Sequence, residues 1–479
     1  MNTSQRGGLG RRAVALIGAL ALALIGTAAI GTAASAADPA PSPSNITGTT
    51  GTLTIHKHAG EPGEAGNGTA ITDPAQIAAL GAGLVGVEFS IQRVSNDGAP
   101  IDLTTAAGWD VAQAATPANV SVAPFSLAAG TTATTGAGGI AVVPNLPYGL
   151  YLVTETSPGA NPIVSPVQPF LVSVPYPDAT NSTWLYNVHV YPKNKLNTTV
   201  PEKTVSAPDG LTLGSSVVWT VTAPVPELGA GDTYTKFMIT DTIDPRLELT
   251  GLVVKVDGVV ISESPAGYTR SGDVIVELNL DTRNTLVAGT DVTIEYTTKV
   301  ISLGEDGTIN NQGFVNVNDS VRETGMPQTN WGPLTVVKKA AQAPNNTLAG
   351  AEFTLHETKG GPAIATYTTN ASGEIVVDGL WVGNGGVLTK DYWLLETKAP
   401  AGYALPTGDA AWTEVTVNAA GENDPTMITI NNTQQNGPNL PLTGSTGTTM
   451  FMLGGLALLL TAGGVALVAS SRRRQGTFQ

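Results

Sequence analysis

Short segments in which apolar and polar residues alternate with a period of two run through the middle of this chain, and they limit it to a fold built from β-strands. This period is the one expected of half-buried strands. Long helical periodicities are missing from the middle of the chain, while Gly and Pro are plentiful, at 56 and 32 residues. We therefore predict an all-β protein of roughly three domains, at about 150 residues each. The clearest alternating face carries Trp184, Tyr186, Val188 and Val190.

The end of this segment, Trp184–Lys195, presents two polar residues to opposite sides. Pro192 is expected to stop the strand or confine it to a sheet edge. If the alternation continues across the proline, Asn194 shares the inward side of Val190, and Lys193 points outward. Lys195 lies just beyond Asn194, so this segment has a second lysine whose amine is a candidate reactive group.

The N-terminus is typical of a secretory signal peptide. Three arginines within the first twelve residues precede the apolar run Ala13–Ile30, and the small residues Ala34–Ala36 follow it. This arrangement predicts a signal peptide over residues 1–36, with cleavage after Ala36. A transmembrane anchor is the alternative. Residues 37–50 are rich in Pro, Ser, Thr and Gly, and we expect a flexible leader.

The C-terminus carries a second set of targeting features. The pentapeptide Leu440–Gly444 (LPLTG) is followed by an apolar span over residues 450–469 and by Arg472–Arg474. About 20 apolar residues are enough to cross a bilayer, and the arginines hold the end in the cytoplasm. On composition alone this is a single-pass anchor.

Composition excludes several classes of function. The chain has no cysteine, so it has no disulfide framework and no thiolate metal site or nucleophile. Its formal charge is −15, and six of its 23 basic residues lie in the terminal segments expected to be removed, which argues against nucleic-acid binding. Carboxylates show no EF-hand-like spacing, and we expect neither metal nor cofactor. A histidine-based site is improbable with only His56, His58, His189 and His356.

An internal repeat links the two ends of the expected β region. Each copy has a strand with a lysine, a glycine turn with a strand, a strand with a glutamate and a terminal strand, and the first copy ends in Trp184–Lys195. We expect domains over residues 51–196, 197–333 and 334–435, with a sorting signal over 436–479. The middle domain lacks the repeated motifs and is predicted to be a different β-sandwich. The repeated segments are Gly51–Gly60, Leu84–Phe89 and Gly149–Ala160, then Leu334–Lys339, Leu348–Phe353, Tyr392–Tyr403 and Ile428–Thr433.

Several lysines and acids fall on apolar faces, where a charge is costly unless it is paired or neutralised. In a dry core, desolvation lowers the pKa of a lysine and raises that of a carboxylic acid. A neutral amine is nucleophilic, and a protonated carboxyl can polarise an Asn carboxamide and pass a proton to departing ammonia. The product is a Lys–Asn isopeptide bond. An ordinary buried ion pair or hydrogen-bonded Asn is the alternative.

Three motifs of this chain closely resemble those of sortase-assembled major pilins, the shaft subunits of pili of Gram-positive bacteria. Trp184 followed by V-x-V-Y-P-K-N is similar to the pilin motif. Tyr392–Tyr403 is similar to the E-box, Y-x-L-x-E-T-x-A-P-x-G-Y. LPLTG with its apolar span is similar to a cell-wall sorting signal. The resemblance implies three tandem immunoglobulin-like domains of the collagen-adhesin B type.

The resemblance also implies how subunits are joined. A sortase cysteine attacks the Thr443 carbonyl, releases Gly444 onward and holds the chain as a thioester, which Lys193 of another copy resolves. Leu440, Pro441 and Leu442 complete the sorting motif.

Within the domains, the resemblance implies intramolecular Lys–Asn bonds promoted by a carboxylic acid. Parity favours Lys338 and Asn432 over their neighbours Lys339 and Asn431. Some similar pilins leave their first domain uncross-linked, so an uncross-linked first domain is the alternative there. The implied sets are Lys203, Asn311 and Asp241, and Lys338, Asn432 and Glu396. A third set, Lys57, Asn194 and Glu155, is predicted because alternation places these polar residues on the apolar sides of their strands.

Together these features predict a secreted, cell-wall-anchored structural protein that polymerises into a surface pilus and supports adhesion and colonisation. Its expected partners are other copies of itself, a class C-type pilin sortase, a housekeeping sortase, peptidoglycan, and minor or tip pilins. Apart from forming its own isopeptide bonds it is not expected to be an enzyme. The alternative is a wall-anchored monomeric adhesin that does not polymerise.

Overall fold

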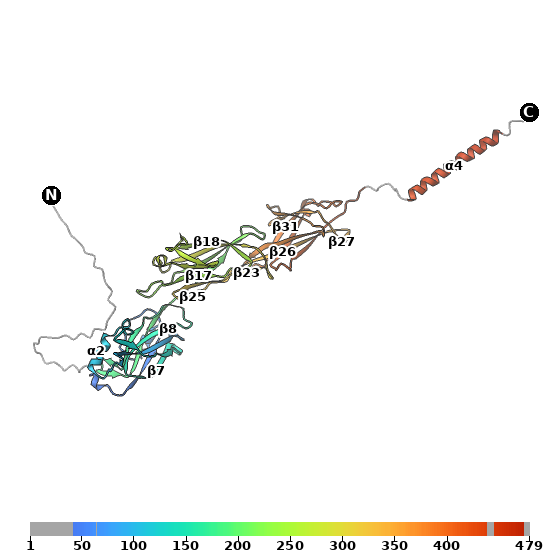
Figure 1. The fold of residues 1–479 in the computed structure, drawn as a ribbon. Coiled ribbons are helices and arrows are strands. Elements are labelled where there is room, and N and C mark those ends of the chain that lie inside the picture. Colours follow the sequence, from blue (N-terminus) through green and yellow to red (C-terminus); the bar gives the residue numbers. More distant parts are fainter. Residues whose placement is uncertain (1–41, 64, 438–444, 474–479) are drawn as a thin grey trace, which may run out of the picture. The chain divides into compact units, whose positions relative to one another are not determined.

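The computed structural model describes residues 42–63, 65–437 and 445–473. The expected signal peptide, the first part of the leader, the LPLTG motif and the end of the basic tail lie outside these residues. The chain divides into two compact units (Figure 1). The first comprises residues 1–159 and 167–193, and the second comprises residues 160–166 and 194–479.

The first unit is built on two sheets. In one, β1 lies between β13, which is parallel to it, and β7, which is antiparallel. The other has the order β10–β8–β3–β4, and β5 and β6 also pair with β3. The strands of these sheets are β1 (Thr50–His56), β3 (Glu88–Asn96), β4 (Ala99–Pro100), β5 (Phe125–Leu127), β6 (Thr131–Thr134), β7 (Ile140–Pro147), β8 (Gly149–Ser157), β10 (Phe170–Val174) and β13 (Asn187–Val190).

Short helices and strands complete the first unit. Asp73 caps α1 by accepting hydrogen bonds from the backbone N–H groups of Ala75 and Gln76, and Thr105 caps α2 by accepting from Gly108. These elements are η1 (Pro43–Asn45), β2 (His58–Ala59), α1 (Pro74–Ala79), α2 (Ala106–Ala114), η2 (Ala137–Gly139), β11 (Tyr176–Asp178) and β12 (Thr183–Leu185).

The pilin-motif segment is not the single strand that its alternation predicts. It is divided at Tyr186, because β12 pairs with β11 whereas β13 pairs with β1, so the chain changes partner strands at this residue. The predicted stop at Pro192 is confirmed: β13 ends at Val190, and β14 (Lys193–Leu196) follows the proline. In the second unit, β14 pairs with β9 (Ile163–Ser165), with Lys195 opposite Ser165.

The second unit contains a sandwich of two five-stranded antiparallel sheets, which we call the middle sandwich. Its orders are β15–β16–β22–β18–β19 and β20–β21–β17–β24–β25. Burial alternates along β16 and β22, as the period of two predicts, and places Trp219 and Tyr296 in the core. Its elements are β15 (Glu202–Val205), β16 (Ser216–Pro224), β17 (Phe237–Asp241), β18 (Leu247–Val256), β19 (Val259–Ile261), β20 (Tyr268–Ser271), β21 (Val274–Leu278), α3 (Leu280–Arg283), β22 (Asp291–Val300), β24 (Gly313–Val317) and β25 (Ser320–Glu323).

A second sandwich, the C-terminal sandwich, is organised around β26. This strand pairs with β23, β27 and β30 antiparallel and with β33 parallel, and the opposite sheet has the order β29–β28–β31–β32. Its elements are β23 (Thr308–Asn310), β26 (Gln328–Ala340), β27 (Ala343–Thr347), β28 (Glu352–His356), β29 (Ala363–Thr368), β30 (Glu374–Asn384), β31 (Thr389–Lys398), η3 (Gly408–Ala411), β32 (Trp412–Asn418) and β33 (Thr426–Asn432).

Strand β26 contributes to the cores of both sandwiches. Trp331 is fully buried in the core of the middle sandwich, whereas Leu334 and Val336 are buried in that of the C-terminal sandwich. One continuous strand therefore holds the two cores together within the second unit.

The last described element is α4 (Ser445–Arg473), drawn as a separate helix in Figure 1. Residues Thr449–Val468 are long and apolar enough to cross a membrane. This agrees with the span predicted over residues 450–469. The predominance of strands over helices confirms the all-β fold class.

Candidate cross-linking sites

The C-terminal sandwich buries a lysine, a glutamate and an asparagine together. We call Lys338, Glu396 and Asn432 the C-terminal trio. The parallel pairing of β26 and β33 sets Lys338 opposite Ile430, two residues before Asn432. Lys338 Nζ donates a hydrogen bond to Asn432 Oδ1 and lies 3.3 Å from Glu396 Oε2, and Asn432 Nδ2 donates to Glu396 Oε1 at 2.6 Å.

Burial changes the protonation of this trio in the direction that favours acyl transfer. Lys338 is fully buried, and Glu396 and Asn432 are nearly so. Desolvation lowers the pKa of Lys338 and raises the pKa of Glu396, and the attraction between the two opposes both shifts. The arrangement thus favours a neutral amine beside a protonated acid, next to the carboxamide that the amine would attack.

The middle sandwich buries a corresponding set, Lys203, Asp241 and Asn311, which we call the middle trio. Lys203 lies on β15 and Asp241 ends β17, while Asn311 follows β23, before the chain enters β24. Lys203 Nζ donates to Asp241 Oδ2. Desolvation lowers the pKa of Lys203 to about 8, against the attraction of Asp241.

A buried tyrosine contacts two members of the middle trio. The Tyr296 hydroxyl donates a hydrogen bond to Asp241 Oδ2, the oxygen that Lys203 also contacts, and it accepts one from Asn311 Nδ2 at 2.8 Å. Asp241 Oδ1 and Asn311 Oδ1 are buried without a hydrogen-bond partner among the described residues. Sequence reasoning missed Tyr296, although its place on the inward face of Val292–Thr298 was a signal that its hydroxyl needs a buried partner.

The first unit has the lysine and the acid of a third set. Lys57 Nζ lies 3.0 Å from Glu155 Oε2, and both side chains are shielded from solvent. Burial lowers the pKa of Lys57 to about 8 in spite of the glutamate. Asn194, the predicted third member, is also fully buried.

An aromatic ring faces each of the three buried lysines, a feature that the sequence analysis did not anticipate. The centroid of the Phe89 ring lies 5.9 Å from Lys57 Nζ. The centroid of the Trp219 ring lies 5.5 Å from Lys203 Nζ. The centroid of the Phe353 ring lies 5.8 Å from Lys338 Nζ. The rings give each amine apolar walls, which adds to the desolvation that lowers its pKa.

The repeat predicted between the first and third domains is present in the strand register. Phe89 pairs with Glu155 across β3 and β8, and Phe353 pairs with Glu396 across β28 and β31. The same aromatic and acid pair is thus used twice.

The two residues that parity favours are more deeply buried than their neighbours. Lys339 is only half-buried and Asn431 is exposed, whereas Lys338 and Asn432 are buried. Lys195 Nζ forms an ion pair of 3.0 Å with Glu227.

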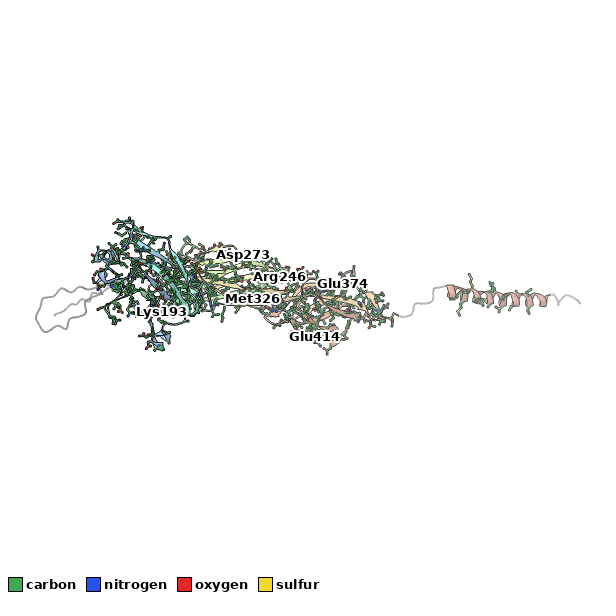
Figure 2. All side chains as sticks on the ribbon, turned by 90° about the horizontal axis from the view of Figure 1, so that it is seen from below. Lys193, Arg246, Asp273, Met326, Glu374 and Glu414 are labelled. Carbon is green, nitrogen blue, oxygen red and sulfur yellow. The ribbon has the colours of Figure 1, made fainter. Side chains whose placement is uncertain are left out.

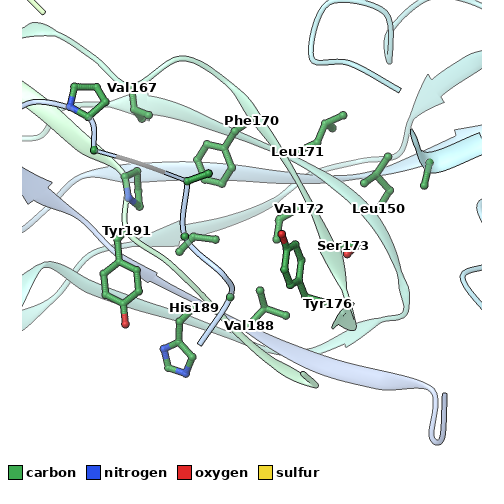
Figure 3. A pocket seen from close by; sticks show the side chains of 18 of the residues that line it. Leu150, Val167, Phe170, Leu171, Val172, Ser173, Tyr176, Val188, His189 and Tyr191 are labelled. Atoms are coloured by element: carbon green, nitrogen blue, oxygen red, sulfur yellow. The ribbon is translucent and has the colours of Figure 1, made fainter. Parts of the chain in front are cut away.

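Lys193 is half-buried at the end of the pilin motif and lines a pocket of about 570 Å³ in the first unit. The residue was predicted to face solvent, so it is more enclosed than expected. Phe170, Tyr176 and Val188 contribute apolar walls (Figure 3). Lys193 is labelled among all the side chains in Figure 2.

The histidines of the first unit lie on the polar side of the pilin motif. His56 Nε2 lies 2.9 Å from His189 Nδ1, and Tyr191 stacks on His56 with ring centroids 4.5 Å apart. Burial and the neighbouring histidines lower the pKa of His56 to about 4, so it is neutral at physiological pH. In the part of the chain that the structure describes, no three His, Cys, Asp or Glu side chains are grouped to hold a metal ion.

Comparisons with known protein families match three parts of the chain. Residues 48–195 match the family "Gram-positive pilin subunit D1, N-terminal domain". Residues 334–434 match "Prealbumin-like fold domain", and residues 432–475 match "LPXTG cell wall anchor motif".

Similar whole proteins are fimbrial subunits and pilins. The fimbrial subunit type 2 of Actinomyces naeslundii is 31% identical, over 98% of this chain and 97% of its own. The fimbrial subunit type 1 of Actinomyces viscosus is 26% identical, over 97% and 98%. The full-length major pilin SpaD of Corynebacterium diphtheriae is 27% identical with a TM-score of 0.60, over 81% of this chain and 98% of its own.

The fold, the buried trios and the anchor motif define an all-β structural protein attached to the bacterial cell wall. More particularly, the chain belongs to the sortase-assembled fimbrial subunits, the major pilins, of Gram-positive bacteria. It is a structural subunit of a surface pilus.

Proposed function

We propose that this subunit forms the shaft of the pilus through a covalent bond between Thr443 of one copy and Lys193 of the next. Two matches within one chain support the proposal. The pilin-domain match ends just after Lys193, and the anchor match includes Thr443. A pilin sortase of class C would carry Thr443 as a thioester, and the Lys193 amine would resolve it.

The pocket beside Lys193 supports this assignment. Once Thr443 is bonded to Lys193, the residues before it must lie next to that amine. Leu440, Pro441 and Leu442 are apolar, and so are most of the side chains that line the pocket. Burial of these residues would hold the junction and remove apolar surface from water.

Within each subunit, we propose isopeptide bonds between Lys203 and Asn311 and between Lys338 and Asn432. Asp241 and Glu396 would carry the proton from amine to leaving ammonia. The buried contacts of the two trios support this chemistry. By the loop-closure relation used for disulfides, a link that closes about 100 residues would stabilise the fold by roughly 4–5 kcal/mol.

We propose a third bond, between Lys57 and Asn194 with Glu155, in the first of three domains over residues 51–196, 197–333 and 334–435. Its support is a shared register. Ile55 pairs with Val190 in parallel strands, as Val336 pairs with Ile428. Lys57 is two residues beyond Ile55 and Asn194 is four beyond Val190, which are the offsets of Lys338 and Asn432 from their own pair.

At the end of assembly, a housekeeping sortase would join the polymer to peptidoglycan, with minor or tip pilins as further partners. Immunoblotting of surface extracts tests the proposal. A ladder of high-mass bands supports a shaft subunit that serves adhesion and colonisation. A single band of monomer mass overturns it in favour of a monomeric adhesin.

A further inference from the structure

The two trios of the second unit differ in how the acid reaches the asparagine. In the C-terminal trio, Glu396 accepts directly from Asn432 Nδ2 at 2.6 Å. In the middle trio, the acid is the shorter Asp241, and the Tyr296 hydroxyl stands between it and Asn311 Nδ2. The tyrosine hydroxyl therefore makes the contact with the asparagine nitrogen that glutamate makes directly in the other sandwich.

We propose that Tyr296 is a catalytic residue of the middle sandwich, and that it relays a proton from Asp241 to the nitrogen that leaves Asn311. The inference rests on the proposed Lys203–Asn311 bond and adds to it the path of the proton. The hydroxyl is the one group that contacts both the acid and the leaving nitrogen among the interactions of the described residues.

The relay accounts for every proton in the reaction. Lys203 first gives a proton to Asp241 and becomes a neutral amine, and its Nζ then bonds to Cγ of Asn311. As the Cγ–Nδ2 bond breaks, Tyr296 gives its proton to Nδ2 and takes the proton of Asp241. Asp241 then takes the second proton from Nζ and ends as the neutral acid. The leaving nitrogen departs as ammonia.

The environment of Tyr296 suits a relay that stays protonated at rest. The side chain is fully buried on β22, opposite Trp219 on β16. Burial and the adjacent Asp241 raise the pKa of Tyr296 far above its usual value, so the hydroxyl keeps its proton until a partner takes it. Lys203 Nζ lies 5.6 Å from the centroid of the same ring. The ring is therefore also part of the apolar surroundings of the Lys203 amine.

The test follows bond formation in Tyr296→Phe. The full chain is made in a host without a pilin sortase, extracted in detergent after a pulse and chase, and digested with trypsin. Mass spectrometry then measures the branched Lys203–Asn311 and Lys338–Asn432 peptides. Loss of a general acid typically slows a reaction about 100-fold or more, and we expect that loss for the first peptide alone. The Lys338–Asn432 bond of the same molecule is the internal control.

Two further variants separate a relay from a structural role. Tyr392→Phe is the matched control, because its buried hydroxyl donates to the Trp381 carbonyl and to neither trio. We expect both bonds to form in it at the wild-type rate. In the double variant Asp241→Glu with Tyr296→Phe, the longer acid can reach Asn311 as Glu396 reaches Asn432. We expect this variant to regain the Lys203–Asn311 bond.

Each outcome decides a different point. Wild-type speed in Tyr296→Phe overturns the relay and leaves the cross-link proposal intact. A double variant without the bond also overturns the relay, because Tyr296 would then be needed for something other than the proton path. Absence of the branched peptide from the wild-type chain refutes the middle cross-link itself, and the relay with it.

Discussion

Lys338 Nζ lies 3.3 Å from Glu396 Oε2 in the C-terminal sandwich, and both side chains are shielded from solvent. Two opposite charges in such a place cost several kcal/mol each in desolvation before their attraction offsets it. Conversion of the amine to an amide removes the charge on both groups. The contact therefore fits the proposed Lys338–Asn432 bond.

Removal of either acid should leave its domain without a bond. Intact mass of the wild-type chain should fall short of the sequence mass by one ammonia for each bond formed. Glu396→Ala and Asp241→Ala should each raise the intact mass by that of one ammonia, apart from the substitution itself. In each variant no acid remains to carry the proton from the lysine amine to the leaving nitrogen. Glu352→Ala is the control, because Glu352 pairs with the exposed Lys398 at 2.6 Å and should change no bond. A full sequence mass for the wild type contradicts this account.

Polymerisation should depend on Lys193 and not on Lys195. Lys193→Ala removes a half-buried side chain and should leave the monomer folded and secreted while abolishing the high-mass ladder on immunoblots. Lys195→Ala is the matched variant, since it removes a nearby amine that is paired with Glu227, and its ladder should persist. The reverse result would transfer the joining role to Lys195.

Alkaline pH should stabilise a variant in which the Lys203–Asn311 bond cannot form. In Asn311→Ala the Lys203 amine stays free, with its folded pKa lowered to about 8 from a usual 10.5. Between these values the unfolded state holds a proton that the folded state lacks, so stability rises with pH and is lost as pH falls through about 8.

Urea unfolding at pH 7 and pH 10 measures this effect. We expect a gain of about 1–3 kcal/mol for Asn311→Ala. The matched variant adds Lys203→Met, which removes the titrating amine and should abolish the gain. An equal gain in both variants would show that other groups cause it.

The bond proposed for the first domain should appear late. Closure between Lys57 and Asn194 fixes the backbone beside Lys193, so we expect it after the sortase has used that lysine. Tryptic mapping should find the branched Lys57–Asn194 peptide in polymer and not in monomer. Its absence from both refutes the bond, and its presence in monomer refutes late closure.

Alternation in the sequence predicted the burial of several of the site residues. Asp241, Asn311 and Lys338 all lie on the inward faces that a period of two assigns to them. The same pattern separated Lys338 from Lys339, because neighbouring residues of a strand face opposite sides.

Alternation could not predict which buried groups meet. Tyr296 lies on β22, Asp241 ends β17 and Asn311 lies between β23 and β24. Their contact depends on sheet pairing that local patterns do not contain. For the same reason the break at Tyr186 was missed, since a change of partner strand leaves the period of two intact. Lys193 was expected to be exposed, but side chains distant in sequence form the pocket that encloses it.

Identification of the bond between subunits tests whether Thr443 of one copy is joined to Lys193 of the next. High-mass polymer is cut from an immunoblot ladder, digested with trypsin and analysed by tandem mass spectrometry. We predict a branched peptide in which the Thr443 carbonyl is joined to Lys193 Nζ, with Gly444 onward missing. Polymer joined through another lysine, or held together without any branched peptide, would contradict this prediction.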